Sequence, residues 1–229
     1  MIVFTGGDKN MNRTIGIILF LVMVFSTISA SSAVIIGSTS YGYVEKFTYG
    51  NLNSDTTIVY ITGVHPLEKE FGYDVANVVK NRSSSLSYKY KVYKIHVTRS
   101  ASDYTQSRTY GQLLAQKFVT PDVIKIDPTF VFDIHENRYG INNYRYPRFL
   151  FPISKDEYTL GIARVITLYK IPSLVIYTPP SVTSVNYVTQ PLANHGIPTV
   201  IYETNTFDSS TRKLSDARIL VNAVDNILF

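Results

Sequence analysis

Four ionisable side chains follow strand-like apolar segments of the sequence. His65 and Glu68 lie three residues apart just after the apolar run 56–62, and His135 and Glu203 each lie at the end of another such run. Two histidines and a carboxylate, with water in the fourth position, form a common catalytic zinc site. A further carboxylate beside the metal can take the proton of the bound water. These residue types therefore indicate metal-assisted hydrolysis.

The combination of these residues matters more than any one of them. A His-x-x-Glu pair occurs by chance in many proteins, and a single histidine at a strand end is more often structural. The carboxyl ends of parallel strands, however, gather along one edge of a sheet, so residues far apart in sequence meet there. Glu203 also closes the apolar stretch 200–202 instead of lying on a solvated face. A charge in that place needs a partner.

Strand and helix patterns alternate along the chain. Apolar, β-branched runs predict strands, and apolar residues at intervals of three and four predict helices. We expect strands at 56–62, 88–97, 129–134, 173–178 and 199–203, and helices at 67–81, 106–119, 156–170 and 210–228. Segments 136–152 and 179–191 show neither pattern. The alternation predicts an α/β fold, a single domain with a mostly parallel, mixed sheet and helices on both faces.

Three segments together resemble the zinc carboxypeptidase superfamily, and most nearly its succinylglutamate desuccinylase/aspartoacylase-like branch. The segments are Gly63-x-His65-x-x-Glu68, Asp133-x-His135, and Gly196-Ile197-Pro198-Thr199 leading to Glu203. The resemblance implies that His65, Glu68 and His135 bind one Zn²⁺ per chain and that Glu203 is the general base. It also implies a zinc-carboxypeptidase-like fold and hydrolysis of an amide or peptide bond.

Asp133 precedes His135 by two residues, so on a strand both side chains face the same way. It could accept a hydrogen bond from the His135 ring and orient it, or it could be an ordinary carboxylate at a strand end. Glu70 and Glu136 flank the expected ligands and could exchange with them in a different register. These alternatives stay open at the level of sequence.

Arginines are the expected partners of the negative charge that forms on the substrate oxygen. Arg99, after the strand 88–97, is the first candidate, and Arg138 and Arg145 come next. Arg138, Arg145 and Arg148 are interleaved with tyrosines and could bind a substrate carboxylate through two parallel hydrogen bonds. The alternative for each is a scattered cation on an exposed loop.

The N-terminus has the pattern of a secretory signal. Basic residues precede an apolar run at 15–25, and small residues follow as far as Ala33. The run is shorter than the about 20 apolar residues that span a membrane. We therefore expect a signal peptide at 1–33, with an uncleaved anchor as the alternative. The domain at 34–229 is expected outside the cytoplasm, secreted or attached to the cell surface, with membrane contact only through an uncleaved N-terminal segment.

Composition excludes several classes of protein. The 229 residues include no cysteine, which excludes a disulfide scaffold, an iron–sulfur centre and a cysteine nucleophile. The formal charge of +5 comes without a dense Lys/Arg run, so we expect no nucleic-acid partner. For an exported amide hydrolase, the expected substrates are peptides, wall-derived peptides or N-acyl amino acids.

Two other functional hypotheses remain beside a zinc-dependent hydrolase of the metallocarboxypeptidase or deacylase type. The first is a non-catalytic cell-surface or wall-binding module on the same scaffold, which would use the Tyr/Arg segment 138–148. The second is a serine hydrolase, for which the sequence holds no Gly-x-Ser-x-Gly motif. The hydrolase with a metal is favoured because a binding module has no need of a base beside three metal ligands.

Overall fold

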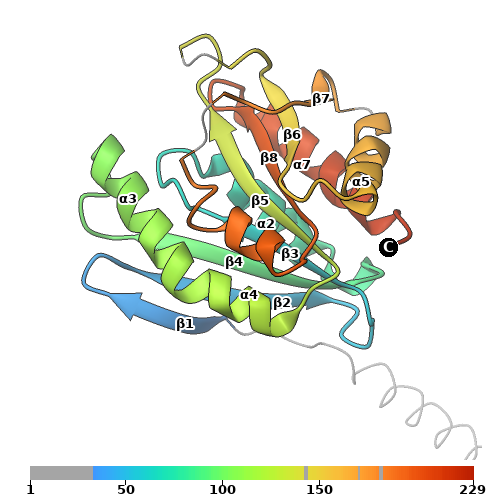
Figure 1. Ribbon diagram of the computed structural model, residues 1–229, viewed down its shortest axis with the longest axis horizontal. Helices are drawn as coiled ribbons and strands as arrows, with labels where there is room; N and C mark the ends of the chain where they lie inside the picture. The colour runs from blue at the N-terminus through green and yellow to red at the C-terminus, as the bar shows by residue number, and fades with distance from the viewer. Residues whose placement is uncertain (1–32, 142–143, 170, 181–182) are drawn as a thin grey trace, which may run out of the picture. The chain divides into compact units, whose positions relative to one another are not determined.

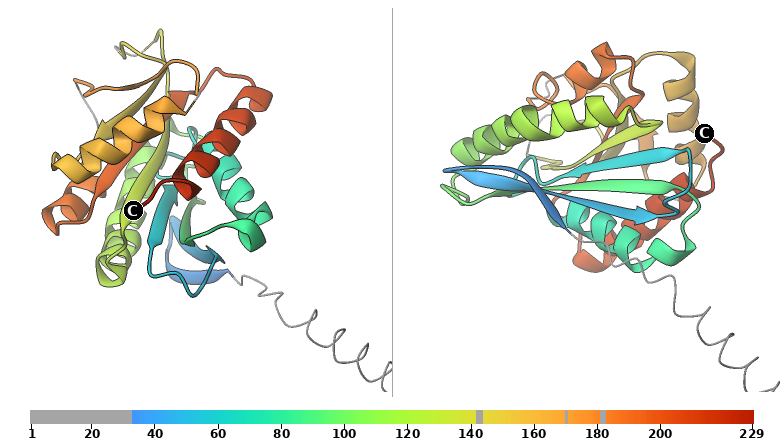
Figure 2. Two further views of the ribbon diagram at one scale, coloured as in Figure 1. Left: turned by 90° about the vertical axis from the view of Figure 1, so that its right-hand side faces the viewer. Right: turned by 90° about the horizontal axis from the view of Figure 1, so that it is seen from below.

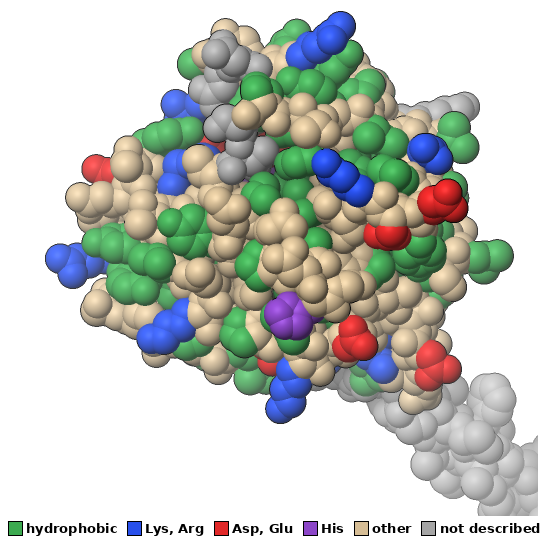
Figure 3. Space-filling view, in the orientation of Figure 1, with side chains coloured by type: hydrophobic (Ala, Val, Ile, Leu, Met, Phe, Trp, Pro, Cys, Tyr) green, Lys and Arg blue, Asp and Glu red, His purple; other side chains and the backbone are tan. Residues whose placement is uncertain are grey.

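The computed structural model of the chain (Figure 1) describes residues 33–229, apart from 142–143, 170 and 181–182. The signal peptide predicted at 1–33 lies outside these residues, except for Ala33. Within the described part of the chain, no helix has the length and apolar character needed to cross a membrane. On the face seen in Figure 3, the described Lys and Arg side chains are scattered among polar and apolar atoms.

A mixed sheet forms the centre of the domain, with the order β1-β2-β4-β3-β5-β8-β6-β7. Its described strands are β1 (Val34–Thr39), β2 (Gly42–Gly50), β3 (Thr57–Thr62), β4 (Lys89–Val97), β5 (Phe130–Asn137), β6 (Arg148–Pro152), β7 (Leu174–Ile176) and β8 (Thr199–Asn205). The neighbours β4, β3, β5 and β8 are parallel, and β6 is parallel to β7. The pairs β1–β2, β2–β4 and β6–β8 are antiparallel.

Helices cover both faces of the sheet. The described helices are α2 (Glu70–Asn81), α3 (Tyr104–Leu114), α4 (Thr120–Ile126), α5 (Glu157–Leu168), α6 (Thr189–Asn194) and α7 (Ser210–Asp225), with a 3-10 turn at Ser83–Ser85 and a π-helical turn at Ala115–Val119. Figure 2 shows α3 and α4 on one side of the strands and α2 and α7 on the other. Residues of α5 join the core beneath α2 and α7, and residues of α6 join the core beneath α3 and α4.

Strand β3 shows why central strands contain continuous apolar runs in the sequence. Ile58 and Tyr60 pack into the core on the α2 and α7 side, whereas Val59 and Ile61 pack into the core on the opposite side. Because successive side chains point to opposite faces, a strand that is buried on both faces favours apolar residues at consecutive positions.

The predicted fold class is confirmed. Each predicted strand and helix is present, although the helix expected at 106–119 consists of α3 and the π-helical turn and continues beyond its predicted end as α4. The β1–β2 hairpin was not expected. Two elements also correct the segments thought to be irregular, because β6 lies within 136–152 and α6 begins within 179–191. Both elements are too short to show a clear periodic pattern in the sequence.

Candidate active site

The register of β5 and β8 brings the third predicted ligand beside the predicted base. His135 is paired with Glu203 across these parallel strands, and Asp133 is paired with Ile201. Paired residues point to the same face of a sheet, as do residues two apart on one strand. His135, Glu203 and Asp133 therefore face the side that α3 covers.

A tight turn after β3 brings His65 and Glu68 to the same place. Gly63 has a φ of +81°, a conformation that favours glycine. Beyond it, the Glu68 N–H donates to the His65 carbonyl at 3.0 Å, so both side chains leave one turn before α2 begins. Helix α3 packs directly against this turn, because a Cβ at Gly111 would overlap the Val64 carbonyl oxygen. The fold thus brings all four candidate residues together.

Three donor atoms converge between the turn and β5. His65 Nδ1 lies 3.1 Å from Glu68 Oε2 and 3.2 Å from His135 Nδ1, and all three residues are buried. A tetrahedral zinc ion with bonds of 2.0–2.1 Å separates its ligands by about 3.3 Å. The donor types and these two separations therefore fit a zinc ion.

Glu68 is at present paired with an arginine instead of being free. Arg108 NH1 donates to both Glu68 oxygens at 2.7 Å, and the Tyr104 hydroxyl donates to Oε1 at 3.2 Å. No cluster of three or more His, Asp or Glu within the described residues has the geometry of a preformed metal site. A metal at this place would have to share or displace the contact between Glu68 and Arg108.

The second ring nitrogen of His65 faces Gln112. The Gln112 side-chain amide nitrogen lies 3.2 Å from His65 Nε2. A metal on Nδ1 requires the proton on Nε2, and after rotation of the amide the Gln112 side-chain oxygen can accept a hydrogen bond from that proton.

Glu203 is a buried carboxyl group whose Oε2 has no hydrogen-bond partner. It lines a small cavity of about 10 Å³, near the minimum for one water molecule. Other lining residues include His65, Glu68, Arg108, Tyr144 and Thr183. Burial, with the nearby charges of Glu68 and Asp133, raises the pKa of Glu203 to about 8. A carboxyl group with such a pKa can exchange a proton near neutral pH.

The two histidines differ in protonation. Burial lowers the pKa of His65 to about 4, so this ring is neutral at pH 7. Burial also acts to lower the pKa of His135, but the charge of Asp133 outweighs it and raises the value to about 9. Burial acts to raise the pKa of Glu68, but His65 and Arg108 lower it to about 2. The metal-free site therefore holds a proton on His135.

Asp133 lies behind His135, as the strand spacing predicts. Its Oδ2 is 3.0 Å from His135 Nε2, on the side of the ring opposite to the Nδ1 that faces His65. Asp133 is fully buried and forms an ion pair with the His135 ring. Its role in orienting the ring stays a prediction.

Helix α3 supplies three site residues that the sequence analysis missed. Tyr104, Arg108 and Gln112 are spaced four residues apart and so lie along one face of the helix. Their side chains reach Glu68 or His65. The signal was present in the sequence as polar residues at helical spacing, but it becomes informative only when the position of the helix is known.

The predicted arginines fall in different places. Arg138 lies near the site, with its guanidinium carbon 4.6 Å from the centre of the Tyr104 ring. Arg145 is exposed and lies over Tyr146. Arg99 is exposed in the turn after β4, and its backbone N–H donates to the Tyr41 carbonyl. Arg108, and not Arg99, is the arginine that contacts the candidate ligands.

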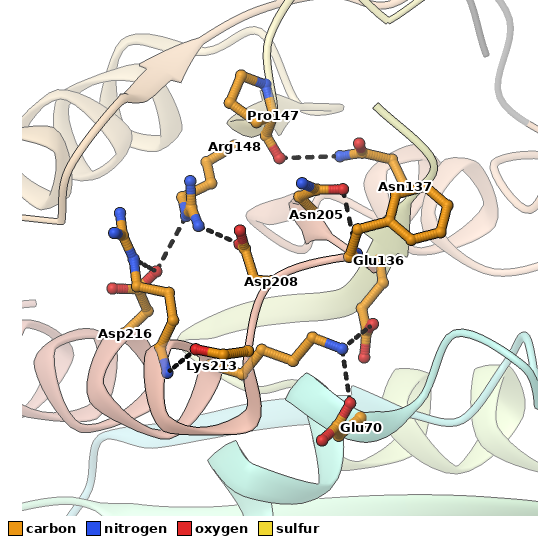
Figure 4. A network of polar contacts seen from close by, with 12 residues as sticks. Glu70, Glu136, Asn137, Pro147, Arg148, Asn205, Asp208, Lys213 and Asp216 are labelled. Carbon is orange, nitrogen blue, oxygen red and sulfur yellow. Dashed lines mark hydrogen bonds and ion pairs between the residues drawn. The ribbon is translucent and has the colours of Figure 1, made fainter. Parts of the chain in front are cut away.

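Arg148 corrects the prediction that it binds substrate. Phe149 is paired with Glu203, so its neighbour Arg148 points to the opposite face of the sheet. There it is buried and forms ion pairs with Asp208 and Asp216 (Figure 4). Both acceptors are on the chain itself, so this guanidinium is not free to bind a substrate carboxylate.

Glu70 and Glu136 do not take the place of the candidate ligands. Both form ion pairs with Lys213 of α7, on the same side as Arg148 (Figure 4). His135 and Glu136 are consecutive on β5 and therefore point to opposite faces. The register that places His135 at the site thus directs Glu136 away from it.

A larger groove lies elsewhere on the domain, between α2 and α7. Its volume is about 510 Å³, and its lining includes Val78, Leu214, Ile219, Arg82 and Arg218. None of the predicted site residues lines it. Volume alone therefore does not point to the chemistry, whereas the convergence of ionisable groups does.

Comparison with known proteins places the fold. No protein-family model matches the sequence, and no curated protein matches it. Among solved structures, a metallo-carboxypeptidase from Burkholderia cenocepacia is similar with a TM-score of 0.55 and 12% identity, over 90% of this chain and 66% of that one. The chain has a metallocarboxypeptidase-like fold. The resemblance predicted from the sequence is thus confirmed for the fold.

Two further structures widen the comparison. An aminopeptidase from Legionella pneumophila has a TM-score of 0.56 and 12% identity, over 93% of this chain and 62% of that one. A succinylglutamate desuccinylase/aspartoacylase from Rhodobacter sphaeroides has a TM-score of 0.53 and 15% identity, over 80% of this chain and 57% of that one. The chain spans less than two thirds of each of these proteins, so their activities do not transfer with the fold.

Proposed function

We propose that this chain is a zinc-dependent hydrolase of amide or peptide bonds, of the carboxypeptidase or deacylase type. The observation that carries the proposal is the convergence of His65 Nδ1, His135 Nδ1 and Glu68 Oε2 beside the buried, unpartnered carboxyl group of Glu203. The fold shared with metallocarboxypeptidases supports it.

His65, Glu68 and His135 would hold the metal. When bound, zinc would supply a water of lowered pKa and a positive charge for the scissile carbonyl. Glu203 Oε2 has no other partner, so it is free to take a proton from the attacking water and to return it to the leaving amine. The narrow cavity would exclude bulk water from this transfer.

Arg108 is the proposed cationic partner of the substrate. Its side chain reaches the cavity from α3 and retains partial access to solvent, with 20% of its surface exposed. Once a metal takes Glu68, the guanidinium can turn to the developing charge on the carbonyl oxygen or to a substrate carboxylate. Arg138, stacked on Tyr104, adds a second positive charge near this place.

The proposed substrates are peptides, cell-wall peptides or N-acyl amino acids outside the cytoplasm. The two arginines near the cavity favour a substrate with a free carboxylate. The location rests on the signal pattern at 1–33 alone. Export would be tested by N-terminal sequencing of protein recovered from the cell exterior, where a start near residue 34 is expected.

Metal analysis with turnover assays tests the activity. The wild-type chain is expected to bind one zinc ion and to hydrolyse acyl-amino-acid or wall-peptide substrates, and a chelator should abolish both. His65→Ala should lose the metal, whereas Glu203→Gln should keep it and lose turnover. A His65→Ala protein that retains a full zinc ion would refute the assignment of the ligands.

A non-catalytic wall-binding module is the second candidate. It is favoured by the ion pair in which Arg108 binds both oxygens of Glu68. In addition, the described residues contain no preformed cluster of three metal-binding groups. Retention on cell-wall material by wild type and Glu203→Gln alike, with no turnover of any substrate, would support this second function over hydrolysis.

A further inference from the structure

A buried lysine connects the two segments that carry the candidate ligands. Lys213 of α7 is 2% exposed, and its Nζ lies 2.6 Å from Glu70 Oε2 and 2.9 Å from Glu136 Oε2 (Figure 4). We propose that Lys213 is a positioning residue, which holds the turn of His65 and Glu68 at a fixed distance from β5 and so sets the metal site.

The positions of the two glutamates carry this inference. Glu70 begins α2, two residues after Glu68, and Glu136 directly follows His135 on β5. Glu136 Oε1 also accepts a hydrogen bond of 2.6 Å from the Phe71 N–H. One ammonium group and one carboxylate therefore connect the first turn of α2 with the end of β5, on the side of the sheet opposite to the candidate ligands.

This arrangement is better explained by geometry than by stability. A buried ion pair is often no more stabilising than well-packed apolar residues of similar volume. Metal sites, in contrast, need their ligands held close to the bonding distances, and residues behind the ligands commonly set affinity. Because the inference rests on the proposed metal site, its test must separate failure of the Lys213 contact from failure of that site.

Arg148 supplies a matched control. It is also a buried cation that joins two carboxylates, those of Asp208 and Asp216. Neither carboxylate is within two residues of a candidate ligand. Arg148→Met should therefore disturb folding as Lys213→Met does, without changing the distance between the two ligand segments.

The experiment measures zinc affinity by competition with a chromophoric chelator in full-length protein. Lys213→Met should bind zinc about 10- to 100-fold more weakly than wild type. Glu70→Gln, a milder change at a half-exposed side chain, should show a smaller loss in the same direction. Lys213→Arg, which can still bridge two carboxylates, should recover most of the affinity, and Arg148→Met should stay within about 3-fold of wild type.

Amide hydrogen exchange of the metal-free proteins provides the independent measurement. Exchange at the Phe71 N–H should increase in Lys213→Met more than the loss of global stability explains, but not in Arg148→Met. If wild type binds no zinc, the proposed function fails, and Phe71 exchange alone decides whether Lys213 fixes the two segments. If zinc affinity or Phe71 exchange changes equally in Lys213→Met and Arg148→Met, Lys213 is an ordinary structural residue.

Discussion

Two polar clusters lie back to back at the carboxyl end of β5. On the α7 side, Lys213 pairs with Glu70 and Glu136, and each charged group has a partner. On the α3 side, Asp133 pairs with His135, but Glu203 Oε2 has no hydrogen-bond partner. Both clusters are largely buried, so burial does not distinguish them. The completeness of their hydrogen bonding does.

Under the proposed function, this difference indicates which cluster receives a ligand. A buried polar atom without a partner costs stability, and native proteins keep few of them. The charged groups of the α7-side cluster avoid this cost by pairing with one another. The α3-side cluster retains an unpartnered Glu203 oxygen near two facing imidazoles, an arrangement that the proposed metal and its water molecule would complete.

The largest expected effect comes from the orphaned carboxyl group. Glu203→Gln keeps the shape of the side chain but cannot accept the proton, so turnover should fall by about 10²- to 10⁴-fold. Zinc content and thermal midpoint should stay close to those of wild type. Turnover within a few-fold of wild type would place the base elsewhere and weaken the contrast between the clusters.

The next effect is on stability and comes from the completed side. Arg148→Met leaves Asp208 unpaired and removes one of two arginines from Asp216, so the free energy of unfolding should fall by about 3–5 kcal/mol. Denaturant unfolding measures this change, while KM for substrates with a carboxylate should not rise. A selective rise in KM would restore the substrate-binding role that the structure removes from Arg148.

The pH dependence of zinc binding tests the charge on the α3 side. The pKa of His135 is raised to about 9 in the metal-free protein, and its proton must leave before the ring can bind zinc. Apparent affinity should therefore rise about tenfold for each pH unit between pH 6 and pH 8.5 and level off above pH 9. His65, with a pKa of about 4, should add nothing in this range. Affinity independent of pH would contradict the binding of zinc by a His135 ring that is protonated in the metal-free protein.

The smallest effect separates two arginines. Arg99 is exposed and contacts none of the candidate ligands, so Arg99→Gln should change kcat/KM by less than about 3-fold. Arg108→Gln should reduce kcat/KM more strongly, because Arg108 lines the cavity beside Glu203 and is the proposed cationic partner of the substrate. Equal effects of the two substitutions in a steady-state assay would argue against Arg108 as the cation that serves the substrate.

The sequence predicted the parts of the structure that local pattern determines. Strands β3 and β8 each contain a continuous apolar run, 58–61 and 200–202, because both of their faces are buried, and this pattern is visible without coordinates. The site residues at their carboxyl ends followed from the parallel arrangement. In contrast, β6 is a five-residue strand whose pairing with β8 and β7 stabilises it, and no local pattern records such partners.

The arginines of the site also could not be assigned from local sequence pattern, because their positions depend on tertiary contacts. The choice of Arg99 used only its place after a strand, whereas Arg108 reaches Glu68 because α3 crosses above the turn at Val64. That crossing depends on the missing side chain of Gly111, which lets α3 approach Val64, a residue distant from the helix in sequence. Arg148 was assigned to the substrate because the strand that directs it to the opposite face of the sheet was not recognised.

X-ray diffraction from zinc-loaded crystals at the zinc absorption edge tests the central claim most directly. We predict one anomalous peak about 2.0–2.2 Å from His65 Nδ1, His135 Nδ1 and a Glu68 oxygen, with Glu203 facing the open coordination position and Arg108 displaced from Glu68. The absence of a peak at this place, with Arg108 still bonded to both oxygens of Glu68, would contradict it.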